Sequence, residues 1–100
     1  MLLLVQGAAF AHSDHGVISG QTAMNITNSS LKKMAFKDFG FEVGKLAGSW
    51  KEVKDTDISV VDVKEHYYIV SAANAELKQT IYFQINNGGT VVNVKANNDF

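Results

Sequence analysis

Apolar residues recur at helical spacing over residues 19–34. They lie three or four positions apart and form one stripe: Ala23, Ile26 or Thr27, Leu31 and Met34. Polar residues fall mostly between them, as on a helix with one buried face. Ser19 precedes the stripe, and a serine hydroxyl in that position accepts a hydrogen bond from an unpaired amide of the first turn. The pattern therefore predicts an amphipathic helix that begins beside Ser19.

Residues 36–50, FKDFGFEVGKLAGSW, do not continue the helical pattern. Three phenylalanines and Trp50 are interrupted by glycines at positions 40, 44 and 48, which is too frequent for a long helix. We expect an irregular segment that lays aromatic rings over one end of the core. A short helical turn around residues 46–53 fits the same segment.

The second half of the chain has the composition of strands. Four segments are rich in β-branched and aromatic residues and are separated by polar or glycine-containing breaks: 58–64, 67–73, 80–86 and 90–96. Such short breaks favour an antiparallel meander. The expected fold class is α+β, with the N-terminal helix packed on one face of an antiparallel sheet of three to four strands. Residues 19–100 would form this single domain.

The turn of the last hairpin predicts which residues face each other. A two-residue type I′ turn at residues 87–88, Asn-Gly, would place Phe83 opposite Val92 on the buried face. Ile81 and Val94 would pair beside them on the same face. The opposite face would carry a mixed set of residues suited to water: Thr80, Tyr82, Gln84, Val91, Asn93 and Lys95. The sheet would then be covered on one side only.

The hairpin before it fits two registers, because a slip of one residue exchanges the two faces. In the register that we favour, three residues point inward: Tyr68, Val70 and Ala72. Tyr67 and Ile69 point inward in the other. The favoured register leaves Tyr67 beside Tyr82 on the open face. The candidate ligand or partner face then comprises Tyr67, Tyr82, Gln84 and Lys95, and the simpler alternative is that these aromatic residues only stabilise cross-strand pairs.

The first residues resemble the end of an export signal. Residues 1–5 are apolar, and Ala9-Phe10-Ala11 is a small-x-small triplet of the kind that signal peptidase cleaves after. We interpret residues 1–11 as a truncated signal-peptide remnant, because the positive n-region is missing, and residues 12–18 as a flexible polar N-terminus of the mature chain. This predicts a periplasmic or secreted protein. A short buried strand or helix turn at residues 2–5 is the alternative, and the run is too short to cross a bilayer.

His12, Asp14 and His15 form the one cluster with metal-ligand character. Cleavage after Ala11 would add a free amine, and amine, imidazole and carboxylate donors suit Cu(II) or Ni(II). The alternative is a flexible stretch that contributes nothing. We interpret His66 as a solvated turn residue and not as a third ligand.

Composition and charge exclude several classes of function. The hydrophobic fraction of 46% supports a packed core, and a net charge of −1 without long charge runs builds no basic stripe for nucleic acid or an anionic membrane. Cysteine is absent, which excludes disulfides and thiol chemistry. A Gly-x-Ser-x-Gly elbow is also absent. We therefore expect no enzymatic activity.

Three segments carry a resemblance to a known kind of domain: DFGFEVGKLAGSW, YYIVSAAN and QTIYFQINNGGTVVNV. Together with the capped helix, they resemble a family of small exported bacterial proteins whose layout is similar to PepSY-like domains. The resemblance implies a non-catalytic regulatory or inhibitory module and supplies no catalytic residues. We expect a binding module that recognises a protein, a peptide or a small ligand through its open sheet face or edge. The alternative is a periplasmic metal-binding accessory protein.

Overall fold

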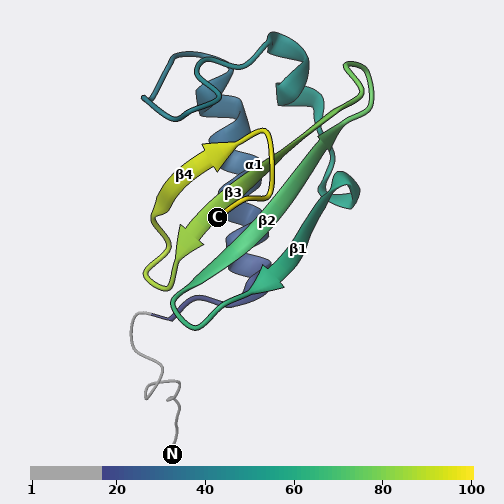
Figure 1. Ribbon diagram of the computed structural model, residues 1–100. Coiled ribbons are helices and arrows are strands. Elements are labelled where there is room, and N and C mark those ends of the chain that lie inside the picture. The colour runs from purple at the N-terminus through teal and green to yellow at the C-terminus, as the bar shows by residue number, and fades with distance from the viewer. Residues whose placement is uncertain (1–16) are drawn as a thin grey trace, which may run out of the picture.

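A computed structural model describes residues 17–100 of the chain and shows one helix against one sheet (Figure 1). The α-helix α1 spans Gly20–Met34, and two short 3₁₀ helices follow it, η1 (Gly48–Glu52) and η2 (Asp55–Asp57). Four strands complete the fold: β1 (Ile58–Val63), β2 (Tyr67–Asn74), β3 (Gln79–Asn86) and β4 (Val91–Lys95). The strands lie in the order β1-β2-β3-β4, and each pairs antiparallel with the next. The predicted α+β fold with an antiparallel meander is confirmed.

The helix begins where the sequence predicts. The Ser19 hydroxyl caps α1 by accepting a hydrogen bond of 3.1 Å from the Thr22 amide. The buried stripe of α1 comprises Ala23, Thr27, Leu31 and Met34, and Ile26 packs partly buried against the core beside it. The Thr27 hydroxyl is satisfied within the helix, because it donates to the Ala23 carbonyl at 3.0 Å. Among residues 17–100, no helix is both long enough and apolar enough to cross a membrane.

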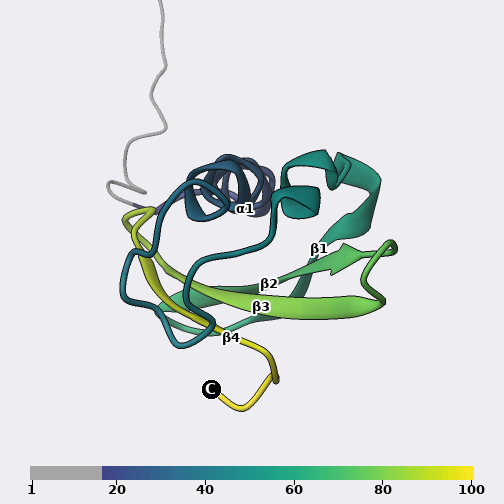
Figure 2. The ribbon, with the colours of Figure 1, turned by 90° about the horizontal axis from the view of Figure 1, so that it is seen from above.

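The core lies between α1 and one face of the sheet. In Figure 2 the helices α1 and η1 cover the same side of the strands. The sheet contributes a buried apolar set: Val70, Ala72, Ile81, Phe83, Ile85 and Val94. Each large side chain among them stabilises the fold by about 1.5–3 kcal/mol relative to an exposed position. This burial holds the sheet to the helix without any disulfide.

The register between β2 and β3 resolves the two alternatives. Val70 pairs with Phe83, so the favoured inward set of β2 is confirmed. The prediction that Tyr67 lies beside Tyr82 is wrong. Tyr82 lies opposite Ser71, whereas Tyr67 lies four positions away, at the other end of β2. Four residues of a strand span about 13 Å, and the two rings are therefore separated along the sheet.

The predicted register of the last hairpin is also wrong. Phe83 pairs with Val94, and Val92, which we expected to be buried, is 49% exposed. A type I′ turn needs positive φ at both central residues, 87 and 88, but in this turn the positive φ is at Gly89 (90°). The turn is longer than two residues, with a hydrogen bond of 2.9 Å from the Asn86 amide to the Thr90 carbonyl, and a bulge beside Gln84 absorbs the extra residue.

The aromatic segment after α1 covers the core only in part. Trp50 is buried in η1, and Phe41 packs partly buried against the core, as predicted. Phe36 is 82% exposed and Phe39 is also exposed, so only Phe41 and Trp50 of this segment supply the expected aromatic cover. Phe36 follows the C-cap residue Ala35 and therefore lies outside α1, past Met34, the last residue of its buried stripe.

Candidate binding face

The sheet has a second face, which points away from α1. Alternation along the strands places on it Tyr67, Ile69 and Ser71 of β2, Tyr82 and Gln84 of β3, and Asn93 and Lys95 of β4. We call these seven residues the outer face. The sequence-predicted residues Tyr67, Tyr82, Gln84 and Lys95 all belong to it. Its functional groups are hydroxyls, amides and one ammonium, which bind through hydrogen bonds and charge. The Asp62 carboxylate of β1 lies on the same side, beside Ile69, and is paired with Lys64.

The strand register arranges the outer face in rows. Ser71, Tyr82 and Lys95 form one row, because Tyr82 pairs with both of the others. Gln84 pairs in the same way with Ile69 and Asn93 in the next row. Neighbouring strands are about 4.8 Å apart, so the Lys95 side chain starts directly beside the Tyr82 ring. The structure therefore brings together three of the four predicted residues and leaves Tyr67 at the far end of β2.

The last residues of the sequence fold back over this face. Figures 1 and 2 show residues 96–100 leaving β4 and turning in front of the strands, on the side opposite α1. The Lys95 ammonium forms an ion pair of 3.2 Å with the Asp99 carboxylate and lies 5.0 Å from the centre of the Phe100 ring. The Lys95 side chain is only 21% exposed as a result. The Lys95 ammonium thus contacts both the Asp99 carboxylate and the Phe100 ring.

Ile69 shows that the outer face has an apolar centre. It is 1% exposed, yet it is not part of the core between α1 and the sheet. Its partner in the register is Gln84, whereas the neighbouring Val70 pairs with Phe83 in the core. Because the Ile69 side chain is buried on this side of the sheet, it stabilises the fold by the hydrophobic effect. Polar groups surround it.

The two edges of the sheet differ in how they are protected. The Val43 amide donates to the Val94 carbonyl at 3.4 Å and covers part of the β4 edge. No other described segment forms a backbone hydrogen bond along the outer edge of β1. A bulge after Val60 and an ion pair of 3.1 Å between Asp62 and Lys64 oppose strand addition there, as on protected natural edges. The outer face is therefore a better candidate for binding than either edge.

The predicted metal ligands His12, Asp14 and His15 lie outside the described residues. The Asn87 carbonyl accepts a hydrogen bond of 2.9 Å from the Ile18 amide, and the Asn87 amide donates to the His66 carbonyl at 3.2 Å. His66 thus lies near the start of the described chain, with its imidazole 80% exposed in the turn between β1 and β2. Within residues 17–100, no cluster of three or more metal-ligating side chains is found.

Asp55, one of the two aspartates in η2, has a structural contact. Asp55 accepts a hydrogen bond of 2.9 Å from the Asn28 side chain of α1, which ties η2 to the helix. This agrees with the general use of aspartates in turns and caps.

The sequence analysis missed two residues that contact the outer face. Asp99 and Phe100 were assigned no role, although Asp99 follows Lys95 at the spacing that pairs opposite charges in a helix. Here the same spacing forms an ion pair where the chain turns back after a strand. An acid and an aromatic residue just after a strand that ends in lysine are the signal that could have identified them.

Comparison with known proteins gives a family but no activity. The model of a family of unknown function (DUF6488) matches residues 1–99, which is nearly the whole chain. No curated protein and no solved structure matches the chain.

Proposed function

The chain belongs to the family of unknown function DUF6488, and we propose that it is a non-catalytic binding or regulatory module. Its outer face would take an extended segment of a partner protein that carries acidic and aromatic side chains. The similarity to PepSY-like domains of exported bacterial proteins supports this role, since such domains are mostly regulatory or inhibitory.

The contact of Lys95 with the chain's own Asp99 and Phe100 carries the proposal. The Lys95 ammonium and the neighbouring amides form a surface that suits an extended peptide, with the buried side chain of Ile69 beneath it. Residues 96–100 occupy this surface within the same chain. A partner segment of similar chemistry would replace them and would make the same ion pair.

A peptide titration tests the proposal. The protein is produced without residues 97–100, and the free peptide Ala-Asn-Asn-Asp-Phe is added while amide chemical shifts are followed by NMR. We expect shift changes confined to the rows of Tyr82 and Gln84, with a Kd of about 1 mM or weaker, because one ion pair and one cation–π contact contribute only about 1–2 kcal/mol.

Two controls make this titration specific. The peptide Ala-Asn-Asn-Ala-Ala should cause no change, and the Lys95→Gln variant should bind at least about threefold more weakly, as expected for one exposed ion pair. Lys33→Gln, which removes an exposed lysine of α1 on the opposite side of the sheet, should bind as the parent does. Equal shifts with both peptides, or none with either, would refute the proposal.

We also propose that the protein is exported to the periplasm or secreted, with cleavage after Ala11. The small-x-small triplet at residues 9–11 supports this. The N-terminal mass of the protein recovered from cells tests it. A chain that begins at His12 is expected, whereas a chain that retains Ala9 and Phe10 would contradict it.

A metal-binding accessory role is the second candidate, and the donor set of the N-terminal sequence supports it. The imidazoles of His12 and His15, the Asp14 carboxylate and a free amine after cleavage behind Ala11 would supply donors that suit Cu(II) or Ni(II).

Calorimetric titration of Cu(II), and then of Ni(II), into protein that begins at His12 tests this role. Tight binding is expected to disappear when both His12 and His15 are replaced by alanine, and to be unchanged in His66→Ala. Equal, weak binding in the parent and in both variants would exclude the metal role.

A further inference from the structure

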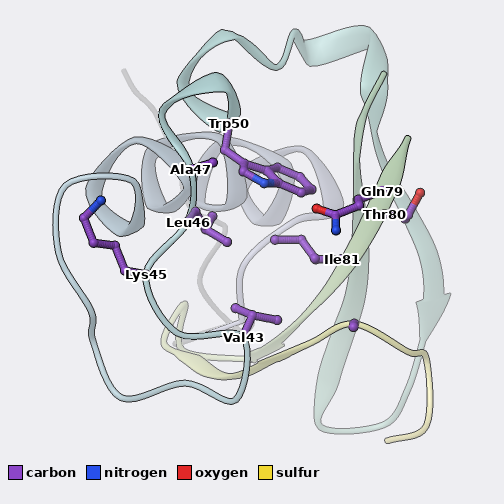
Figure 3. Close-up of a pocket in the computed structure, with 9 residues that line it drawn as sticks. Val43, Lys45, Leu46, Ala47, Trp50, Gln79, Thr80 and Ile81 are labelled. Carbon is purple, nitrogen blue, oxygen red and sulfur yellow. The ribbon is translucent and has the colours of Figure 1, made fainter. Parts of the chain in front are cut away.

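A cavity of about 420 Å³ lies on the α1 side of the sheet, at the end where β3 begins (Figure 3). It opens between residues 43–50 and the adjoining ends of β3 and β4. The walls are mainly apolar and include Val43, Leu46, Trp50 and Ile81. Ligand pockets commonly measure about 300–1,000 Å³ and combine such walls with a few polar groups. The cavity has the size and the wall chemistry for a small ligand.

The Trp50 indole places a buried hydrogen-bond donor beside the cavity. Trp50 is 2% exposed, and within residues 17–100 its indole N–H forms no hydrogen bond. In Figure 3 the indole nitrogen lies on the edge of the ring that faces Leu46 and Ile81. A buried donor without a partner carries a desolvation cost, which a ligand acceptor in the cavity would remove.

Two further polar groups lie around the cavity. The Gln79 side chain lines the cavity, and Figure 3 shows its amide oxygen on the side of the Trp50 ring and its nitrogen on the other side. The NH₂ group can donate to a ligand. Lys45 lines the mouth with the stem of its exposed side chain, and its ammonium points outward. No acidic residue lines this cavity. The available groups thus offer donors and one cation, and they favour a ligand with acceptor oxygens and a negative charge.

We infer that this cavity binds a small organic carboxylate with a flat apolar body. The body would lie against the indole of Trp50 and the side chain of Ile81. The carboxylate oxygens would accept from the Trp50 and Gln79 donors, and the Lys45 ammonium would turn in to supply the opposite charge at the mouth. The cavity lies on the opposite side of the sheet from the outer face, so this inference is independent of the proposed peptide binding.

Trp50 reports on the cavity directly, because it is the single tryptophan of the chain. The full-length protein is titrated with 3-phenylpropionate, 3-phenylpropanamide and 3-phenylpropylamine while tryptophan emission is recorded. These probes share one body and differ in charge. We expect a saturable change with the carboxylate below about 10 mM, and weaker binding of the neutral amide and of the amine.

Three variants locate the binding. Ala96→Leu adds a side chain at an exposed position of the cavity lining and should abolish the response without unfolding the protein. Lys45→Gln should weaken carboxylate binding by about threefold to fivefold and leave amide binding unchanged. Lys51→Gln, in η1 but outside the lining, should behave as the parent does.

Each outcome decides the inference. No saturable response to the carboxylate, or an equal response in Ala96→Leu, would show that the cavity is not the binding site. Binding that Ala96→Leu abolishes but that is equal for all three probes would overturn the assignment of a carboxylate. Circular dichroism of each variant confirms that a lost response does not come from unfolding.

Discussion

At the level of single residues, Gly88 and Gly89 are adjacent glycines with different backbone requirements. Gly89 has a φ of 90°, a region that L side chains rarely adopt, whereas Gly88 lies outside that region. A Cβ on Gly89 would also meet Ile26 at 3.4 Å and Ile18 at 3.5 Å. The position of this one positive φ explains why the turn is not the two-residue turn that the Asn-Gly pair predicts.

The two glycines give a matched prediction. Gly89→Ala should lower the free energy of unfolding by about 1–3 kcal/mol, because alanine is strained at this φ. Gly88→Ala should change it by less than about 1 kcal/mol, since the nearest atom to a new Cβ, Asn86 Oδ1, is at an ordinary 3.5 Å. Urea denaturation of both variants measures the difference, and equal effects would contradict the turn geometry.

Buried polar residues give a second prediction at this scale. The Asn74 side chain donates to the Ser49 hydroxyl at 3.0 Å and accepts from the Leu77 amide at 3.2 Å, and so connects η1 to the turn between β2 and β3. Asn74→Ala should cost about 1–3 kcal/mol, because partly buried groups lose their partners.

The Thr27→Val variant serves as the comparison. It should cost less than about 1 kcal/mol, since the Ala23 carbonyl keeps its backbone hydrogen bond within α1 and valine fills nearly the same space. Thermal unfolding ranks the two variants, and a larger loss in Thr27→Val would be inconsistent with these contacts.

At the level of elements, the N-terminus of α1 depends on one side chain. Ser19 is the cap, and the first turn carries no acidic residue. Ser19→Ala should destabilise the protein by about 1 kcal/mol through the loss of the cap. Ser19→Asp keeps an acceptor and adds a negative charge that favours the helix N-terminus, so it should be at least as stable as the parent at pH 7. Chemical denaturation at low salt tests the order, and a stable Ser19→Ala variant would contradict it.

The elements also show what the sequence can and cannot determine. Helix α1 and all four strands follow from residue periodicity and turn composition, because their patterns depend on local spacing. The register of β4 does not, because it depends on the φ of one glycine in the turn. The position of Trp50 over the core is anticipated, but the cavity beside it is not, since residues 43–50 and 79–81 meet only in the folded chain.

The outer face is predictable only in part, for a similar reason. Alternation places Tyr82, Gln84 and Lys95 on one side of the sheet. The burial of Ile69 on that side, and the return of Asp99 and Phe100 to Lys95, are tertiary contacts that no periodic pattern encodes.

At the level of the whole molecule, the sheet separates two regions. The side that faces α1 holds the core and the cavity beside Trp50, and the outer face holds residues 96–100 (Figure 2). Phe100→Ala should therefore change the NMR shifts of Tyr82 and Lys95 and leave the emission maximum of the buried Trp50 unchanged. A red shift of that emission would show that the two sides are coupled, against this account.

The central claim is that the outer face holds an acidic and aromatic segment through Lys95. The most direct measurement is a nuclear Overhauser spectrum of the full chain, which reports protons that lie within about 5 Å of each other. The account predicts cross-peaks between the Phe100 ring and the side-chain methylene groups of Lys95, which the Lys95→Gln variant should weaken. A Phe100 ring with random-coil shifts and no cross-peak to β3 or β4 would contradict it.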